Sequence, residues 1–146
     1  MNRFLATATL MLLISSTSIA YAQQSKSSLI AHPKTTPAYG VLVLRKVAAE
    51  VELQKMLSMV SDRHPDVKLK RYEIDVLDRE MKRIRMIRKS STPKLTTTYG
   101  MLILHQVAVE VELETLLGRV SEKSPDMINK RVELSILKRE IAKVLQ

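Results

Sequence analysis

A histidine and a carboxylate flank a proline in the sequence His64-Pro65-Asp66, which occurs once in the chain. Imidazole and carboxylate groups transfer protons and bind metal ions, so this tripeptide is the first candidate for a chemical site. A corner between two helices is the alternative, because proline lacks an N–H group and fits the first turn of a helix. With no cysteine and no His-x-x-x-His pair in the chain, the sequence predicts no metal and no cofactor.

Two pairs of carboxylates, Glu50 with Glu52 and Glu110 with Glu112, have the residue type that acid–base catalysis uses. Residues two apart do not share a face of a helix, so we expect both pairs at a solvated edge. A phosphate-binding loop needs several glycines, and the whole chain has three. The sequence therefore predicts a protein that is not an enzyme.

The strongest charged feature is a basic run in residues 82–89. It could bind anionic envelope polymer or lipid headgroups, or it could complement the macrodipole at the end of a helix. The net charge of +9 comes mainly from the first half of the chain. Residues 35–92 hold 13 basic and 8 acidic side chains, whereas residues 93–146 hold 8 basic and 7 acidic side chains. The possible anion patch consists of Lys82, Arg83, Arg85, Arg88 and Lys89.

These residues are positioned by a tandem repeat. Residues 39–84 align with residues 99–144 without a gap, and 21 of these 46 positions are identical. Such self-similarity indicates one supersecondary unit used twice. The candidate histidine is not repeated, which favours the corner over a catalytic site. The two turns are formed by His64, Pro65 and Asp66 and by Ser124, Pro125 and Asp126.

Apolar residues in each unit recur at alternating spacings of three and four, which is typical of a heptad pattern. The pattern predicts an all-α protein of two tandem antiparallel helical hairpins, coiled-coil-like, over residues 35–89 and 99–146, with a linker at 90–98. Short strands at 41–44 and 101–104 are an alternative. The polar heptad residues Lys46, Lys70, Gln106 and Lys130 are expected near helix ends, with their polar groups in water.

A second apolar stripe, beside the heptad positions, includes Leu44, Val47 and Val51. A hairpin with two apolar faces needs a further partner. The two hairpins could pack together as a four-helix bundle, or each could pair with another chain. The linker length favours the bundle.

The N-terminal segment has the layout of a secretory signal peptide over residues 1–22, with Arg3, an apolar stretch and small residues before the cleavage site. The residues expected at that site are Ala20, Ala22 and Gln23. An uncleaved membrane anchor is the alternative. After cleavage the chain would have no transmembrane segment, and residues 23–34 would form a flexible leader. We expect the protein to be periplasmic or secreted in a bacterium. Export also argues against nucleic acid as a partner.

Residues 53–84 combine an apolar helix, a turn and a second helix, with a pattern formed by His64, Pro65, Asp66, Val67, Glu73, Ile74 and Leu77. In this pattern they resemble the periplasmic coiled-coil region of bacterial exopolysaccharide chain-length and export proteins of the Wzz/GumC type. The second unit keeps Pro125, Asp126, Glu133 and Leu137 but lacks the His and the Val. Neither a terminal membrane helix pair nor a kinase phosphate loop is present. The resemblance implies a helical hairpin linked to polysaccharide export.

Together these features predict an exported, non-enzymatic protein that acts by helix-mediated association with a protein partner or with itself. The alternative function is a binding module for anionic envelope polymer or lipid, through the basic end of the first hairpin.

Overall fold

The computed structural model describes residues 32–146. In chain order its elements are η2 (Pro33–Thr35), α1 (Pro37–Met59), α2 (Pro65–Arg85), η3 (Lys89–Lys94), α3 (Thr97–Leu117) and α4 (Pro125–Leu145). Residues 32–146 contain no strand, so the predicted all-α class is confirmed. The alternative of strands at 41–44 and 101–104 is wrong, because both runs continue without a turn residue and lie inside α1 and α3.

The start of the described chain differs from expectation at one point. Pro33 and Lys34 were expected in a flexible leader, but they belong to η2, and Pro33 is buried. The His32 side chain accepts a hydrogen bond from the backbone N–H of Lys34, which caps this short helix. The expected signal peptide and its cleavage residues lie outside the described residues.

Several ion pairs between the two helices of the first hairpin recur in the second hairpin, at an offset of 60 residues. In the first, Lys70 lies 2.6 Å from Glu52 and 2.7 Å from Glu73; in the second, Lys130 lies 2.6 Å from Glu112 and 2.9 Å from Glu133. Two further pairs in each hairpin also correspond: Arg45–Glu73 with His105–Glu133, and Arg71–Asp62 with Arg131–Glu122. Exposed ion pairs contribute little to stability, but their repetition shows that the two hairpins have the same internal geometry.

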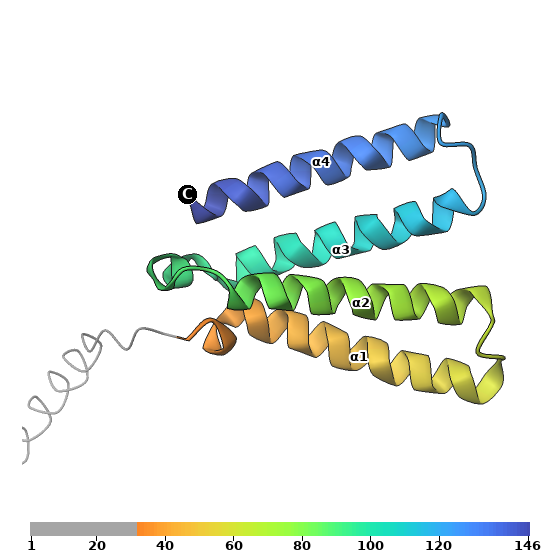
Figure 1. The fold of residues 1–146 in the computed structure, drawn as a ribbon, viewed down its shortest axis with the longest axis horizontal. Helices are drawn as coiled ribbons and strands as arrows, with labels where there is room; N and C mark the ends of the chain where they lie inside the picture. Colours follow the sequence, from red (N-terminus) through yellow and green to blue (C-terminus); the bar gives the residue numbers. More distant parts are fainter. Residues whose placement is uncertain (1–31) are drawn as a thin grey trace, which may run out of the picture.

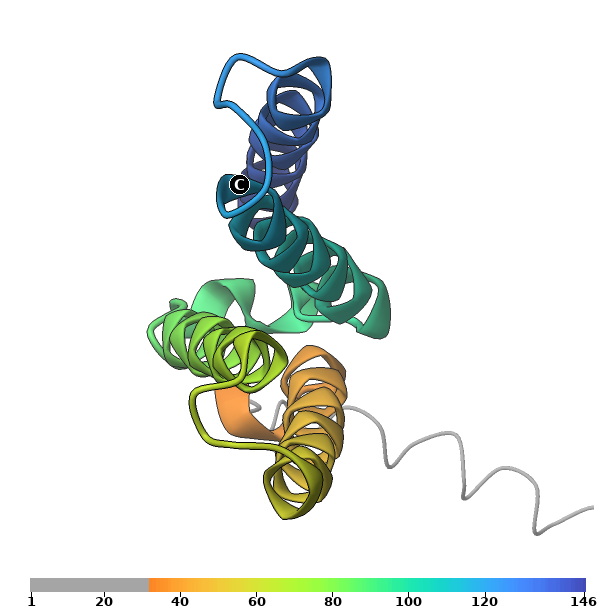
Figure 2. The same cartoon turned by 90° about the vertical axis from the view of Figure 1, so that its right-hand side faces the viewer.

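The two hairpins pack against each other on one side only. Helix α3 lies against both α1 and α2, whereas α4 packs on α3 and η3 (Figure 1). Seen end-on, α4 and α1 lie on opposite sides of the molecule (Figure 2). The main core therefore lies among α1, α2 and α3. Its largest fully buried apolar side chains are Leu42, Leu77, Ile84, Leu95 and Ile103.

The segment between the hairpins takes part in this core. It forms η3, and Leu95 directly after it is 1% exposed. The carbonyl of Leu95 accepts a hydrogen bond of 3.2 Å from the backbone N–H of Ala38. Burying an apolar side chain of this size contributes about 1.5–3 kcal/mol, so the linker helps to fix the first hairpin on the second.

The expectation that the polar heptad residues lie near helix ends is wrong for Lys46 and Gln106, whereas Lys70 and Lys130 do lie near the starts of α2 and α4. Lys46 and Lys70 lie in the middle of α1 and near the start of α2, and both are paired with carboxylates rather than free in water. Gln106 is 1% exposed, in the middle of α3. Its amide is buried because α2 packs over it, and two carboxylates accept its hydrogen bonds.

The turn residues act as helix caps. The Ser124 hydroxyl accepts a hydrogen bond of 3.3 Å from the N–H of Met127, and His64 Nδ1 accepts one of 3.3 Å from the N–H of Asp66. Pro65 and Pro125 open α2 and α4. The repeat therefore keeps the cap but changes the residue that supplies it.

This cap predicts the effect of two substitutions. We expect Ser124→Ala to lower the free energy of unfolding by about 1 kcal/mol, because an N–H of the first turn loses its acceptor. His64→Ser copies the second unit, and we expect a change within about 0.5 kcal/mol. Chemical denaturation followed by circular dichroism measures both. A larger loss from His64→Ser than from Ser124→Ala would contradict the role of these residues as caps.

Candidate functional site

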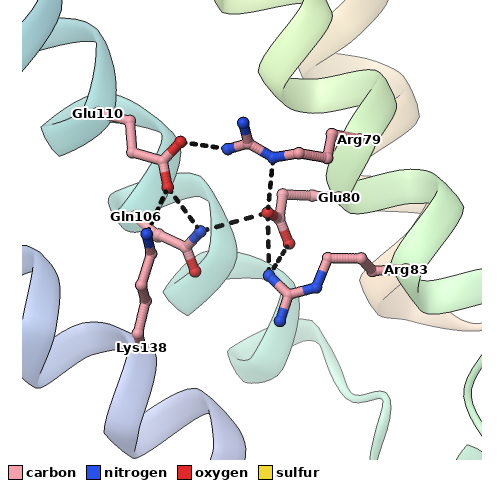
Figure 3. Close-up of polar contacts among 6 residues, drawn as sticks. All are labelled: Arg79, Glu80, Arg83, Gln106, Glu110 and Lys138. Carbon is pink, nitrogen blue, oxygen red and sulfur yellow. Dashed lines mark hydrogen bonds and ion pairs between the residues drawn. The ribbon is translucent and has the colours of Figure 1, made fainter.

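The most elaborate polar cluster of the described residues joins the two hairpins (Figure 3). Gln106 of α3 donates from one amide nitrogen to Glu80 of α2 at 3.3 Å and to Glu110 of α3 at 3.0 Å. Arg79 pairs with Glu110, and Lys138 of α4 lies 3.4 Å from the same carboxylate. Residues from three helices therefore meet around two carboxylates that are almost inaccessible to water.

Both carboxylates of this cluster are already occupied. The side chains of Glu80 and Glu110 are 3% and 7% exposed, and Arg83 lies 2.9 Å from Glu80. Burial alone would raise the pKa of Glu110, but hydrogen bonds from Arg79 and Gln106 outweigh it and hold that pKa below its usual value. Glu110 is therefore ionised at neutral pH and is poorly suited to serve as a general acid. The cluster's geometry fixes α2 on α3.

The earlier expectation for Glu110 is wrong, because α2 covers this residue, whereas its repeat counterpart Glu50 is exposed as expected. Glu50 and Glu110 lie in nearly identical sequences, residues 47–53 and 107–113, which differ only at Ala49 and Val109. The repeat alone therefore gives no signal for which copy is buried. The side-chain amide oxygen of Gln106, Oε1, is buried and has no hydrogen-bond partner among residues 32–146.

Two apolar faces are exposed on opposite sides of the molecule. On α1 the face consists of Leu44, Val47 and Val51, which are 73%, 51% and 49% exposed. On α4 it consists of Ile128, Val132 and Ile136, which are 49%, 53% and 45% exposed. We call these sets the α1 face and the α4 face. Their spacings of three and four residues place each set along one side of its helix.

The possible anion patch is spread over the end of α2, the start of η3 and the turn between them, and all five of its side chains are exposed. Arg83 is engaged with Glu80, and Arg85 Nε donates to the carbonyl of Met81 at 3.3 Å. Basic residues here also lie where the macrodipole of α2 is negative. The structure thus spreads the five cations over the end of α2 and the segment after it, and it uses two of them within the fold.

Other chemistry-bearing residues are scattered. Within residues 32–146, no group of three or more His, Asp or Glu side chains could hold a metal ion. His64 lies at a turn and His105 lies on α3, so they belong to different hairpins. In the same part of the chain, none of the helices is both long and apolar enough to span a membrane.

Comparisons with family models, with curated proteins and with solved structures find no match to this chain.

Proposed function

We propose that this protein is an exported, non-enzymatic helical-hairpin protein that acts by associating with protein in the bacterial envelope. The observation that carries the proposal is the pair of exposed apolar faces on α1 and α4. Six large aliphatic side chains at helical spacing are left uncovered, although the same chain buries a compact core. Apolar side chains gathered on one exposed surface mark association sites more often than single exposed residues do.

The location and the pathway rest on the sequence. The signal-like segment at residues 1–22 supports export, and the resemblance of residues 53–84 to Wzz/GumC-type hairpins supports a link to polysaccharide export. The structure adds that the polar clusters are engaged in holding helices together. Association through helix faces is therefore the function that this chain is best equipped to perform.

Photo-crosslinking in cells tests the proposal. A photoreactive amino acid is placed at Val47 on the α1 face or at Ile136 on the α4 face, and the full-length chain is expressed in its own host. We expect crosslinked protein adducts in the envelope fraction from at least one face. The control position is Lys123, an exposed residue of the turn between α3 and α4.

The control should give few adducts, because an exposed polar turn lacks the apolar surface that drives association. Two results would count against the proposal. One is the absence of protein adducts at both faces. The other is equal labelling at Lys123 and at the faces, which would indicate random collisions.

A further inference from the structure

The interface between the hairpins has two sides that come from different surfaces of the repeat. One side is formed by α1 and α2, with Ala38, Val76 and Arg79; the other is formed by α3, with Val107 and Glu110. A contact between two unlike surfaces of the same unit is heterologous. Its two sides therefore have counterparts elsewhere in the chain, 60 residues away.

The reciprocal contact is not made within the molecule. If the interface had two-fold symmetry, Arg139 would pair with Glu50, as Arg79 pairs with Glu110. Instead Arg139 and Glu50 make ion pairs only with neighbours on their own helices, among the described residues. Helices α1 and α4 lie too far apart for the contact, on opposite sides of the molecule (Figure 2).

The counterparts of the buried interface residues are exposed. Val107 is 3% exposed and its counterpart Val47 is 51% exposed. On the other side, Val76 is 1% exposed and its counterpart Ile136 is 45% exposed. By contrast, residues that face the partner helix within a hairpin are buried in both copies, as with Leu77 at 0% and Leu137 at 9%. The exposed faces are thus the two halves of an interface that the chain already forms once.

The charges of the two open halves are complementary. Replacing the residues that pair across the interface by their counterparts turns Arg79–Glu110 into Arg139–Glu50, with the same charges. It turns the contact between Glu80 and Gln106 into Glu140–Lys46, two side chains of opposite charge, of which Lys46 already pairs with Asp78 in its own hairpin. Lys138, which lies near Glu110 within the second hairpin, has an acidic counterpart, Asp78. Electrostatic complementarity of this kind sets the orientation of two partners and excludes others.

The glycines show the same relationship. A Cβ atom on Gly100 would lie 2.9 Å from Ala38 Cα, so the internal interface needs a glycine there. At Gly40, its counterpart, a Cβ would have no atom of the described chain within 4 Å beyond its own turn of the helix. In a second copy of the interface Gly40 would face Thr98 and Met101, which are both exposed.

We propose that the occupant of these faces is a second copy of this chain, docked head to tail so that the α4 face of one molecule covers the α1 face of the next. The inference rests on the proposed function and names its partner. A heterologous contact repeats, so the product is either an open filament or a closed ring. Each added molecule would continue the stacking that joins the two hairpins within the chain.

Two single substitutions block one face each. Val47→Asp places a charge on the α1 face, and Ile136→Asp places one on the α4 face. Both sites are about half exposed in the single molecule, so the monomer should fold unchanged, as circular dichroism can verify. Sedimentation equilibrium of the protein expressed from the full-length sequence then measures association. Each variant should self-associate at least about tenfold more weakly, because a packed apolar contact would have to bury an unpaired carboxylate.

Mixing the two variants gives the decisive result. The Ile136→Asp protein keeps an intact α1 face, and the Val47→Asp protein keeps an intact α4 face. We expect two monomeric variants to form a one-to-one dimer that grows no further, because both remaining faces carry a charge. Met59→Asp, on an exposed residue outside both faces, should associate like the unmodified chain.

Three results would overturn the inference: an unmodified chain that stays monomeric at all concentrations, an Ile136→Asp or Val47→Asp variant that still associates normally, or a mixture that stays monomeric. The second result would mean that like faces pair with each other. If the adducts crosslinked in cells contain only a different protein, the second copy is rejected as the partner. The proposed function would still stand.

Discussion

Replacing Val107 by aspartate should lower the free energy of unfolding by about 3–5 kcal/mol, which is the range expected when a buried charge is left without a partner. Val107 is 3% exposed where α3 packs on the first hairpin, so the carboxylate would be largely removed from water. The same substitution at Val47, its counterpart in the repeat, should change the stability of the monomer by less than about 0.5 kcal/mol.

Chemical denaturation of both variants at low protein concentration provides the measurement. Burial would raise the pKa of the new carboxyl in Val107→Asp. A group whose pKa is raised on folding destabilises most when the pH lies above that pKa, so the deficit should shrink as the pH falls. Equal losses from Val107→Asp and Val47→Asp would mean that the two faces are equally covered, which contradicts the one-sided interface.

The second large effect concerns the two glycines at equivalent positions in α1 and α3. Gly40→Ala should stabilise the monomer by about 0.5–1 kcal/mol, because alanine favours a helix and the site is open. Gly100→Ala should destabilise it by about 1–2 kcal/mol, because the cost of overpacking exceeds that gain. The atoms that the added methyl would meet include the Cα and carbonyl oxygen of Ala38, at 2.9 and 3.0 Å, and a backbone cannot rotate away as a side chain can.

Thermal denaturation of the two alanine variants, again at low concentration, shows whether the effects have opposite signs. Two stabilised variants would mean that the contact between α1 and α3 can relax at little cost. Gly40→Ala has a further use, because the docked second copy would bring Thr98 and Met101 against this position. The same substitution that stabilises the monomer should therefore weaken its self-association.

The sequence predicted the hairpins because the information for them is local. Apolar positions at spacings of three and four specify helices with one buried side, and Pro65 and Pro125 mark where the second helices begin. The residues that join the helices of a hairpin, such as Lys70 with Glu52, recur in the second unit as Lys130 with Glu112. A pattern that is present twice can be recognised even without the structure.

The contact between hairpins could not be predicted in the same way. Val47 and Val107 are the same residue, with Ala on one side, yet only Val107 is covered. Burial here depends on which surface of one unit meets the other, which is a property of the assembled molecule. Gln106 shows the same limit, since α2 of the other hairpin makes its position a buried one. From the sequence alone, a polar residue at a heptad position is expected to reach water.

The one-sided packing of α4 also bears on how the fold opens. Helix α2 buries seven residues between its own hairpin and α3, whereas α4 buries three, against α3 and η3. Proteins open locally in cooperative units, and the unit with the least buried apolar surface opens at the lowest cost. Backbone amide protons of α4 should accordingly exchange with solvent deuterium sooner than those of α2. A neighbouring molecule docked on the α4 face would slow that exchange. The backbone amides of α4 would therefore be fully protected from exchange only inside an assembly.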